Sequence, residues 1–336
     1  MYELEVDRII NEMRRRGSKR VLLQMPEGLK PMGFELAMML EKSTGVEVFV
    51  SGDPCYGACD LALYPKRHVE ADLLIHIGHA EIPGEFPEEK VLYIEARAQV
   101  PIDEPMLQAV QMLEKEQVIG LASSVQHMNQ IDRAREILQE HGKEVLVGSA
   151  SGWLRYAGQV LGCDYGSVRS IAEKVDAIVV LSGGDFHALG IPLATGKRTI
   201  VVDPFQRSAR DLTEMCRKLL RQRWASITRF KEAKKIGIVV GLKSSQMNIS
   251  LARRLKELLE KAGYSTVLLC TNEVIPETLE SFTDIEAFVE ISCPRISTDD
   301  QDRYRKPILN PEETMVALGK KEWEDYTNRM NLEEWH

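Results

Sequence analysis

Short apolar runs alternate with longer amphipathic segments along most of the chain. Runs such as RVLLQ at 20–24 and DAIVVL at 176–181 are rich in Val, Ile and Leu and show no polar alternation, which is typical of parallel strands buried on both faces. Segments such as MNQIDRAREILQEHGK at 128–143 carry apolar residues at helical spacing, and Gly142 and Gly263 stand where helices are expected to end. A chain that alternates strands and helices in this way folds into parallel sheets covered by helices.

One order of elements occurs three times. A strand, a glycine turn, a helix and a second strand are predicted within 19–53, 117–149 and 234–273, and two further apolar runs follow in each copy. Three such units match the usual domain size of about a hundred residues. Because PIDEPM and DPFQRSARD interrupt the pattern, we place three similar α/β domains at 1–104, 105–210 and 211–336. Residues 312–336, with two tryptophans, are predicted to form a helical tail that packs on the core or on a partner.

Composition and charge narrow the possible classes of function. Hydrophobic residues make up 44% and charged residues 28% of the chain, as in soluble globular proteins, and no apolar run reaches the roughly 18 residues of a membrane span. Residues 1–20 resemble an amphipathic helix rather than a signal peptide, so a cytoplasmic location is expected. A net charge of −8 argues against a general nucleic-acid binder. One basic cluster is interpreted as a solvated helix face: Arg217, Lys218, Arg221 and Arg223.

Cysteine placement is the most informative chemical feature. Six cysteines are too few for a disulfide scaffold in a chain of 336 residues, and in a reducing compartment clustered cysteines more often bind metal or act in catalysis. Ligands of open parallel sheets bind beyond the carboxyl ends of the strands. One cysteine per unit is predicted to lie there: Cys59 after a second strand, Cys163 after a second strand and a short helix-like stretch, and Cys293 at the end of a third strand. These thiols can converge if the units pack around a common axis.

Spacing alone leaves the chemistry of these thiols open. Structural zinc prefers four ligands in paired hooks, and no second hook follows Cys55 and Cys59. An iron–sulfur cubane held by three cysteines leaves one iron open for reaction, and three unrelated buried thiols are an equally good interpretation. Cys216 and Cys270 are interpreted as structural, whereas Cys55 either shares a metal with Cys59 or lines the turn.

Taken together, several motifs resemble one known family. GDPCYGACD at 52–60, GCDYG at 162–166 and EISCPR at 290–295 are similar to the archaeal radical enzyme of diphthamide biosynthesis, the 2-(3-amino-3-carboxypropyl)histidine synthase family. The resemblance extends along most of the chain, because further motifs occur in the family's order: MPEGLK at 25–30, IGHA at 77–80, GGDFHALG at 183–190, DPF at 203–205, GLKSSQ at 241–246 and KPILNP at 306–311.

The resemblance implies a cofactor, a reaction and partners. It assigns Cys59, Cys163 and Cys293 as ligands of a [4Fe–4S] cluster between three similar domains, and it leaves Cys55 outside the cluster. It implies that S-adenosylmethionine binds the open iron and that its Cγ–S bond is cleaved reductively, with an electron donor supplying the electron. The resulting 3-amino-3-carboxypropyl radical adds to C2 of a histidine of translation elongation factor 2, and 5′-methylthioadenosine is released. A homodimer is also implied.

Six further residues near strand ends are candidates for binding or proton transfer: Ser182, Gly183, Gly184, Gln246, His79 and His187. The serine and the two glycines can offer backbone N–H groups to the methionine carboxylate, although a packing turn is an equal alternative. The glutamine, expected to start a helix, can bind a ligand or cap that helix. The two histidines stand where a proton acceptor for the attacked imidazole would be useful, while a structural role is the alternative for each.

The chain departs from ordinary radical enzymes that use S-adenosylmethionine. After Cys55 and Cys59, the next position of the C-x-x-x-C-x-x-C pattern is Ala62, so that cluster geometry is excluded. Three dispersed cysteines permit another approach of the sulfonium to iron and hence cleavage of another bond. Two alternatives stay open: a cluster-dependent dehydratase resembling quinolinate synthase, and a non-catalytic partner subunit.

Overall fold

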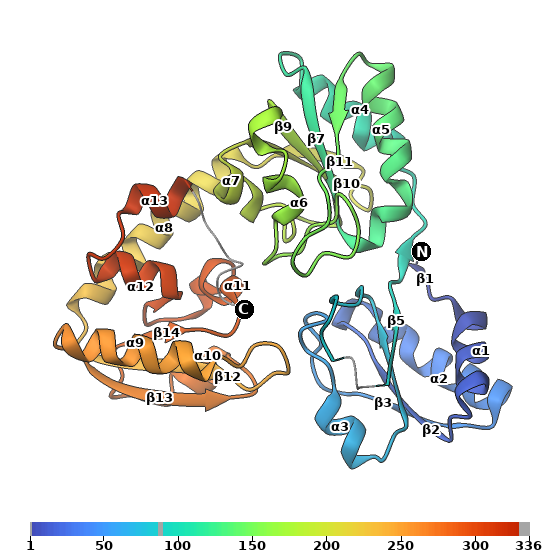
Figure 1. Ribbon diagram of the computed structural model, residues 1–336, viewed down its shortest axis with the longest axis horizontal. Coiled ribbons are helices and arrows are strands. Elements are labelled where there is room, and N and C mark those ends of the chain that lie inside the picture. The colour runs from blue at the N-terminus through green and yellow to red at the C-terminus, as the bar shows by residue number, and fades with distance from the viewer. Residues whose placement is uncertain (1, 87–89, 329–336) are drawn as a thin grey trace.

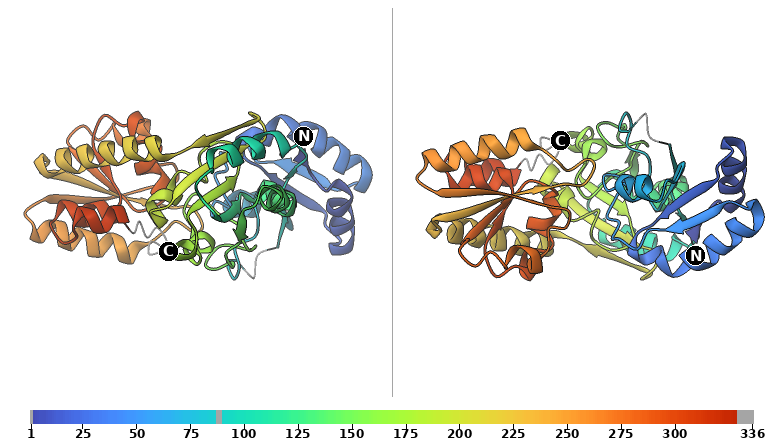
Figure 2. Two further views of the ribbon diagram at one scale, coloured as in Figure 1. Left: turned by 90° about the horizontal axis from the view of Figure 1, so that it is seen from above. Right: turned by 90° about the horizontal axis from the view of Figure 1, so that it is seen from below.

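The fold consists mainly of three separate sheets, each flanked by helices (Figure 1). The computed structural model describes residues 2–86 and 90–328. Figure 1 shows the three units around a common centre, and in both views of Figure 2 the second unit lies between the other two. A small antiparallel pair, β1 (Tyr2–Glu3) and β6 (Arg97–Ala98), ties the start of the described chain to the connection between the first and second units. The predicted fold class is confirmed, while domain boundaries at 104 and 210 stay a prediction.

The first sheet is parallel throughout and is covered on both faces, which explains its unbroken apolar runs. Leu23 belongs to the core beneath the first two helices, whereas its neighbour Leu22 belongs to a second core that contains Leu61. The strand order is β3-β2-β4-β5. The elements are β2 (Arg20–Gln24), β3 (Glu47–Val50), β4 (Leu73–Ile77), β5 (Val91–Ile94), α1 (Val6–Arg16), η1 (Glu27–Met32), α2 (Gly33–Thr44) and α3 (Leu63–His68).

The second sheet is parallel except for one edge strand, in the order β11-β10-β9-β7-β8. One face packs on α4 and α5, and the other face shares a continuous core with the third unit. The strands are β7 (Val118–Ser123), β8 (Glu144–Leu146), β9 (Ala177–Leu181), β10 (Arg198–Asp203) and β11 (Ser208–Asp211). The helices are α4 (Asp103–Met112), η2 (Val125–Gln130), α5 (Ile131–Glu140), α6 (Gly166–Arg169), η3 (Ala172–Lys174) and α7 (Gly190–Thr195).

The third sheet is parallel throughout, in the order β13-β12-β14-β15. Its edge strand carries Cys270, which was expected to be buried and is exposed. The reason is that an edge strand has a neighbour on one side only, and Val267 and Leu268 of the same strand are also exposed. The elements are β12 (Lys235–Gly241), β13 (Ser265–Thr271), β14 (Ala287–Glu290), β15 (Ile308–Leu309), α9 (Ile249–Lys261), α10 (Pro276–Leu279), α11 (Pro294–Thr298), η4 (Gln301–Arg303) and α12 (Pro311–Ala317).

The long helix α8 (Thr213–Glu232) joins the second and third units, packing on α7 and α12. Arg217, Lys218 and Arg221 are exposed as predicted, but the prediction for Arg223 is wrong, because this residue is buried. Arg223 stands one helical turn from Ile227, on the face that packs on the third unit.

The described part of the C-terminal tail packs on the core rather than away from it. Helix α13 (Trp323–Asn328) lies against α7, and the Trp323 ring is 5.1 Å from that of Trp224 on α8. The second tryptophan of the tail, Trp335, lies outside the described residues. No helix in the described ranges is both long enough and apolar enough to cross a bilayer.

Candidate functional site

The Cys59 loop is held in place by the third unit. Residues 54–62, between β3 and α3, form turns, and their position depends on the segment that follows β12. The Cys59 carbonyl oxygen accepts hydrogen bonds from the Ser245 backbone N–H at 3.2 Å and from Ser244 Oγ at 3.1 Å. Lys243 Nζ forms an ion pair with Asp60 at 2.9 Å. Cys59 is therefore positioned at the contact between the first and third units.

Cys163 lies in a long loop of the second unit, and the helix-like stretch expected before it is absent. Residues 147–165 form turns rather than a helix, because Asp164 closes the loop by accepting hydrogen bonds from the Trp153 N–H at 2.8 Å and the Gly166 N–H at 2.9 Å. A Cβ at Gly162 would lie 2.5 Å from the Phe186 ring. A larger residue beside Cys163 would therefore displace the Phe186 ring.

Cys293 follows β14 and begins α11, as the sequence predicts for the end of a third strand. Glu290 accepts hydrogen bonds from the backbone N–H groups of Ser292 at 3.0 Å and Cys293 at 3.1 Å. Two residues further on, Arg295 donates to the Phe186 carbonyl at 2.8 Å and lies over the Phe186 ring. These contacts join the Cys293 segment to the second unit.

The three cysteines, one from each unit, come close enough for their charges to interact. Burial is the main cause that raises the pKa of each thiol. After burial, the charges of Cys293 and Cys59 contribute most to raising the pKa of Cys163. The charge of Cys59 is likewise the second cause that raises the pKa of Cys293. The nearby Arg295 guanidinium works in the opposite direction and lowers the pKa of Cys163 and Cys293. Three thiolates in one half-buried place need such positive charge, which a bound metal centre supplies.

Orphaned polar atoms beside these cysteines fit a bound polar group. Ser245 Oγ, Glu290 Oε1, Ser292 Oγ and Arg295 Nε are buried and have no hydrogen-bond partner among the described residues. Buried polar groups are nearly always paired, so a cluster of unpaired ones needs a reason. All four lie within four residues of Lys243 or Cys293 along the chain. The residues present therefore fit a thiolate-bound cluster together with a small polar ligand.

The weaker predictions for binding residues are partly corrected. Gln246 does not start or cap a helix, because α9 begins at Ile249 with Asn248 as its cap. Instead its side-chain amide reaches Cys59 Sγ at 3.6 Å. The Ser182 N–H donates to Val202 and the Gly184 N–H to Asp203, so these two groups are not open to an anion. Of the three, only the Gly183 N–H has no hydrogen bond to the described residues.

The two predicted histidines face the same region from different units. His187 lies close enough to His79 and to Arg295 for their charges to act on it. Burial lowers the pKa of His79 to about 4, and burial with the Arg295 charge lowers that of His187 to about 3. Both imidazoles are therefore neutral at neutral pH.

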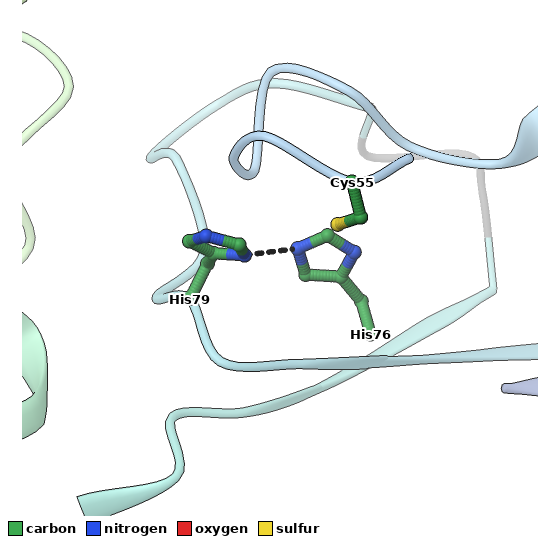
Figure 3. A group of neighbouring side chains, drawn as sticks. All are labelled: Cys55, His76 and His79. Atoms are coloured by element: carbon green, nitrogen blue, oxygen red, sulfur yellow. Dashed lines mark hydrogen bonds between the residues drawn. The ribbon is translucent and has the colours of Figure 1, made fainter. Parts of the chain in front are cut away.

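Sequence reasoning missed two groups of residues near the site. His76, inside the apolar run LLIHI, is buried and hydrogen-bonded to His79 at 3.0 Å. Figure 3 shows Cys55 beside this pair, and the ligand atoms of Cys55, His76 and His79 lie within 4.8 Å of one another. Arg295 was inside a quoted motif but was not singled out. A charged or titratable residue within an apolar strand, or directly after one, was the signal available for both.

The buried histidines predict a loss of stability in weak acid. An unfolded histidine binds a proton near pH 6.5, whereas folded His79 does so only near pH 4, so the unfolded state binds more protons in between and the free energy of unfolding falls as pH drops from 6.5 towards 4. Glu290, with a pKa raised to about 8 by burial, acts in the opposite direction. The variant His79→Gln isolates the contribution of this histidine. The fall in the free energy of unfolding between pH 6.5 and pH 5, measured by anaerobic urea unfolding, should be about 1–2 kcal/mol smaller in the variant than in the unmodified chain. An unchanged loss would contradict the buried neutral imidazole.

Comparison with known proteins gives a consistent result. The family of putative diphthamide synthesis proteins matches residues 25–327. The 2-(3-amino-3-carboxypropyl)histidine synthase of Pyrococcus horikoshii is 36% identical over 96% of this chain and 92% of its own length. Subunit 1 of the same synthase from Encephalitozoon cuniculi is 30% identical over 99% of this chain and 93% of its own length.

A solved structure has the same fold. The crystal structure of Dph2 from Pyrococcus horikoshii with a 4Fe-4S cluster superposes with a TM-score of 0.86 at 35% identity, covering 96% of this chain and 93% of that one. The family match, the full-length relatives and the shared fold all point the same way as the three converging cysteines. The chain therefore belongs to the diphthamide synthesis protein family.

Proposed function

We propose that this chain transfers the 3-amino-3-carboxypropyl group of S-adenosylmethionine to C2 of a histidine on translation elongation factor 2, the first step of diphthamide biosynthesis. The observation that carries the proposal is the convergence of Cys59, Cys163 and Cys293, each from a different unit, in one half-buried place. A relative named as this synthase at 36% identity, and a structural neighbour with a 4Fe-4S cluster, support it.

In this proposal the three cysteine thiolates hold a [4Fe–4S] cluster. When bound, the cluster supplies one electron for reductive cleavage of the Cγ–S bond and an iron without a protein ligand. The Gln246 amide, 3.6 Å from Cys59 Sγ, donates a hydrogen bond that tunes that thiolate. Three separate ligand segments fix the cluster between the units, so the cleaved bond and the acceptor imidazole meet in one enclosed place.

In this proposal, the methionine moiety of S-adenosylmethionine is bound mainly by the buried polar groups that lack a hydrogen-bond partner. Arg295 Nε is a buried donor without a partner among the described residues, in a guanidinium that also pairs with Asp299, and it suits the α-carboxylate. The buried hydroxyl groups of Ser245 and Ser292 and the N–H of the exposed Gly183 can complete the hydrogen bonds of the amino-acid moiety. His79 and His187 remain the candidate catalytic residues for proton removal from the acceptor imidazole. We further expect a cytoplasmic homodimer that takes its electron from a separate donor.

An anaerobic assay tests the function. The purified, cluster-loaded chain is incubated with S-adenosylmethionine, dithionite and elongation factor 2. We expect 5′-methylthioadenosine by chromatography and one added aminocarboxypropyl group on the elongation factor by mass spectrometry. Elongation factor 2 with its acceptor histidine replaced, and a reaction without dithionite, are the controls.

Two outcomes would overturn the proposal in distinguishable ways. An intact cluster that yields no methylthioadenosine would favour a dehydratase, in which the open iron acts as a Lewis acid. Activity that appears only when a different sister chain is added would identify this chain as a supporting subunit.

A further inference from the structure

A chain of three buried side chains in the first unit leads towards the centre of the molecule. His76 Nδ1 is 2.8 Å from Gln24 Oε1, and His76 Nε2 is 3.0 Å from His79 Nδ1. Figure 3 shows the two imidazoles, His76 on β4 and His79 just after it, joined through this second hydrogen bond. Gln24 and His76 are almost completely buried, whereas His79 is partly exposed. The chain thus runs from the sheet interior to a ring that is open on one side.

The orientation of the Gln24 amide is fixed by the backbone. Its Nε2 donates to the Asp60 carbonyl at 2.6 Å, and its Oε1 accepts from the Ala62 N–H at 3.0 Å. A carbonyl cannot donate and a backbone N–H cannot accept, so the amide cannot be flipped. Oε1 is therefore an acceptor towards His76 as well.

The histidine tautomers follow from that acceptor. His76 Nδ1 must carry the proton that Gln24 Oε1 accepts, so the neutral ring has a bare Nε2. That bare nitrogen accepts from His79, and so His79 carries its proton on Nδ1. His79 Nε2, on the far side of the ring from His76, is left with a free lone pair.

The backbone of the turn that carries His79 is also held in place. Gly78 has φ +96° and packs against Pro26, where a Cβ would lie 2.9 Å from Pro26 Cγ. Its carbonyl accepts a hydrogen bond from Gln126 of the second unit at 2.5 Å. The turn that carries His79 is therefore clamped between the first and second units, and His79 lies near enough to His187 for its charge to act on that ring.

We infer that Gln24 and His76 are positioning residues that lock His79 in its Nδ1–H tautomer, so that His79 Nε2 takes the C2 proton from the target imidazole. This inference rests on the proposed function and names which of the two candidate histidines acts. The Ser182 hydroxyl beside His187 Nδ1, at 3.4 Å, can donate or accept and so does not impose one tautomer.

The step balances in atoms and electrons. Addition of the aminocarboxypropyl radical forms a C–C bond at C2, which then carries both the new group and its original hydrogen. Aromaticity returns when that hydrogen leaves as a proton to His79 Nε2 and one electron leaves to the oxidised iron–sulfur cluster. That electron replaces the one consumed in the cleavage of the Cγ–S bond.

A metal ion bound by Cys55, His76 and His79 is the competing interpretation of the same atoms. Among the described residues this group contains three possible ligands, whereas a closed structural zinc site needs four. A proton already joins the two ring nitrogens that a metal would occupy. The hydrogen-bonded chain is therefore the interpretation that the contacts favour.

A matched pair of variants tests the tautomer lock in the cluster-loaded chain. In His76→Gln the side-chain amide can still reach His79 Nδ1 and accept its proton, whereas in His76→Asn the shorter amide keeps the Gln24 side but cannot reach His79. We expect His76→Asn to form methylthioadenosine within about twofold of the unmodified chain while aminocarboxypropyl transfer falls at least about tenfold, since a positioned base contributes about 10²–10⁴-fold. His76→Gln should keep the two products coupled.

Other readouts separate a structural role from a positioning role. Iron content and unfolding temperature show whether His76→Asn folds. His79→Gln, at the partly exposed position, tests the base itself, and transfer should fall at least about tenfold. In the oxidised chain with ¹⁵N-labelled histidine, the nitrogen shifts should show a protonated Nδ1 and a bare Nε2 at His79. That measurement tests the lock even if the unmodified chain makes no methylthioadenosine, an outcome that would defeat the proposed function alone.

Three results would overturn the inference. In the first, methylthioadenosine formation and transfer fall together in His76→Asn. In the second, transfer is unaffected in both His76→Asn and His79→Gln. The third is one equivalent of zinc in the purified chain that disappears in Cys55→Ser, which would show a metal centre in place of the hydrogen-bonded chain.

Discussion

Replacement of Cys59, Cys163 or Cys293 by alanine is expected to remove most of the iron from the chain and more than about 100-fold of its activity, because changes beyond the direct ligands of a metal already cost about 10–100-fold. Each of these cysteines comes from a different unit, and among them only Cys59 has a second thiol in its own segment, Cys55, whose side chain lies beside His76 and His79. The measurement is iron and labile sulfide per chain after anaerobic reconstitution, together with methylthioadenosine formation.

Cys55→Ala and Cys216→Ala are the matched controls, and both should keep the iron. The Cys55 thiol lies beside His76 and His79, and the family resemblance leaves it outside the ligand set. Cys216 is packed in the core on α8. Loss of iron in Cys55→Ala would show that the pairing with Cys59 was wrongly excluded. A full cluster in each of the three ligand variants would reject the ligand set.

Much of the fold could be predicted because buried parallel strands are recognisable in the local sequence as short, continuous apolar runs. The runs that became β2, β4, β9 and β12 are apolar on both faces, and each face has its own core in the structure. The errors concern residues whose environment is set by distant elements. Cys270 is exposed because no strand of the described residues pairs with the outer side of β13. Local hydrophobicity carries no information about which strand forms an edge.

The candidate site was harder to predict, since its residues meet across three units. Spacing alone did not show whether Cys59, Cys163 and Cys293 are cluster ligands or unrelated thiols. The family resemblance favoured cluster ligands. The hydrogen-bonded chain that ends at His79 needs Gln24 and His76. Each of these two polar residues lies next to apolar residues in its strand. The pairing of β2 with β4 places Gln24 opposite His76, and that register is not visible in the sequence.

A buried ion pair between Arg223 and Glu313 is expected to have a large effect on the free energy of unfolding. Both side chains are almost completely buried, at 1% and 0% exposure. Arg223 binds the carboxylate through two nitrogens, at 2.6 and 2.5 Å, and donates to the Ile308 carbonyl at 2.7 Å. The carboxylate in turn accepts from the Asn310 N–H in the capping box of α12. The pair therefore ties α8 to the strand and helix that end the third sheet.

Arg223→Met is expected to lower the free energy of unfolding by about 3–5 kcal/mol, because it leaves a buried carboxylate without its counter-charge. Arg217→Met on the same helix is the matched control. Its ion pair with Glu214 is 65% and 77% exposed, so the change should stay below about 1 kcal/mol. Urea unfolding of the anaerobic chain measures both.

The double variant Arg223→Met/Glu313→Gln separates two reasons for the loss. Glutamine can still accept the Asn310 N–H and so keeps the capping box, while it removes the unpaired charge. If the buried charge dominates, the double variant should recover most of the stability lost in Arg223→Met. A double variant as unstable as the single one would show instead that the hydrogen bonds of the guanidinium to Ile308 and Gln301 hold the third unit together, and that the ion pair adds little to them.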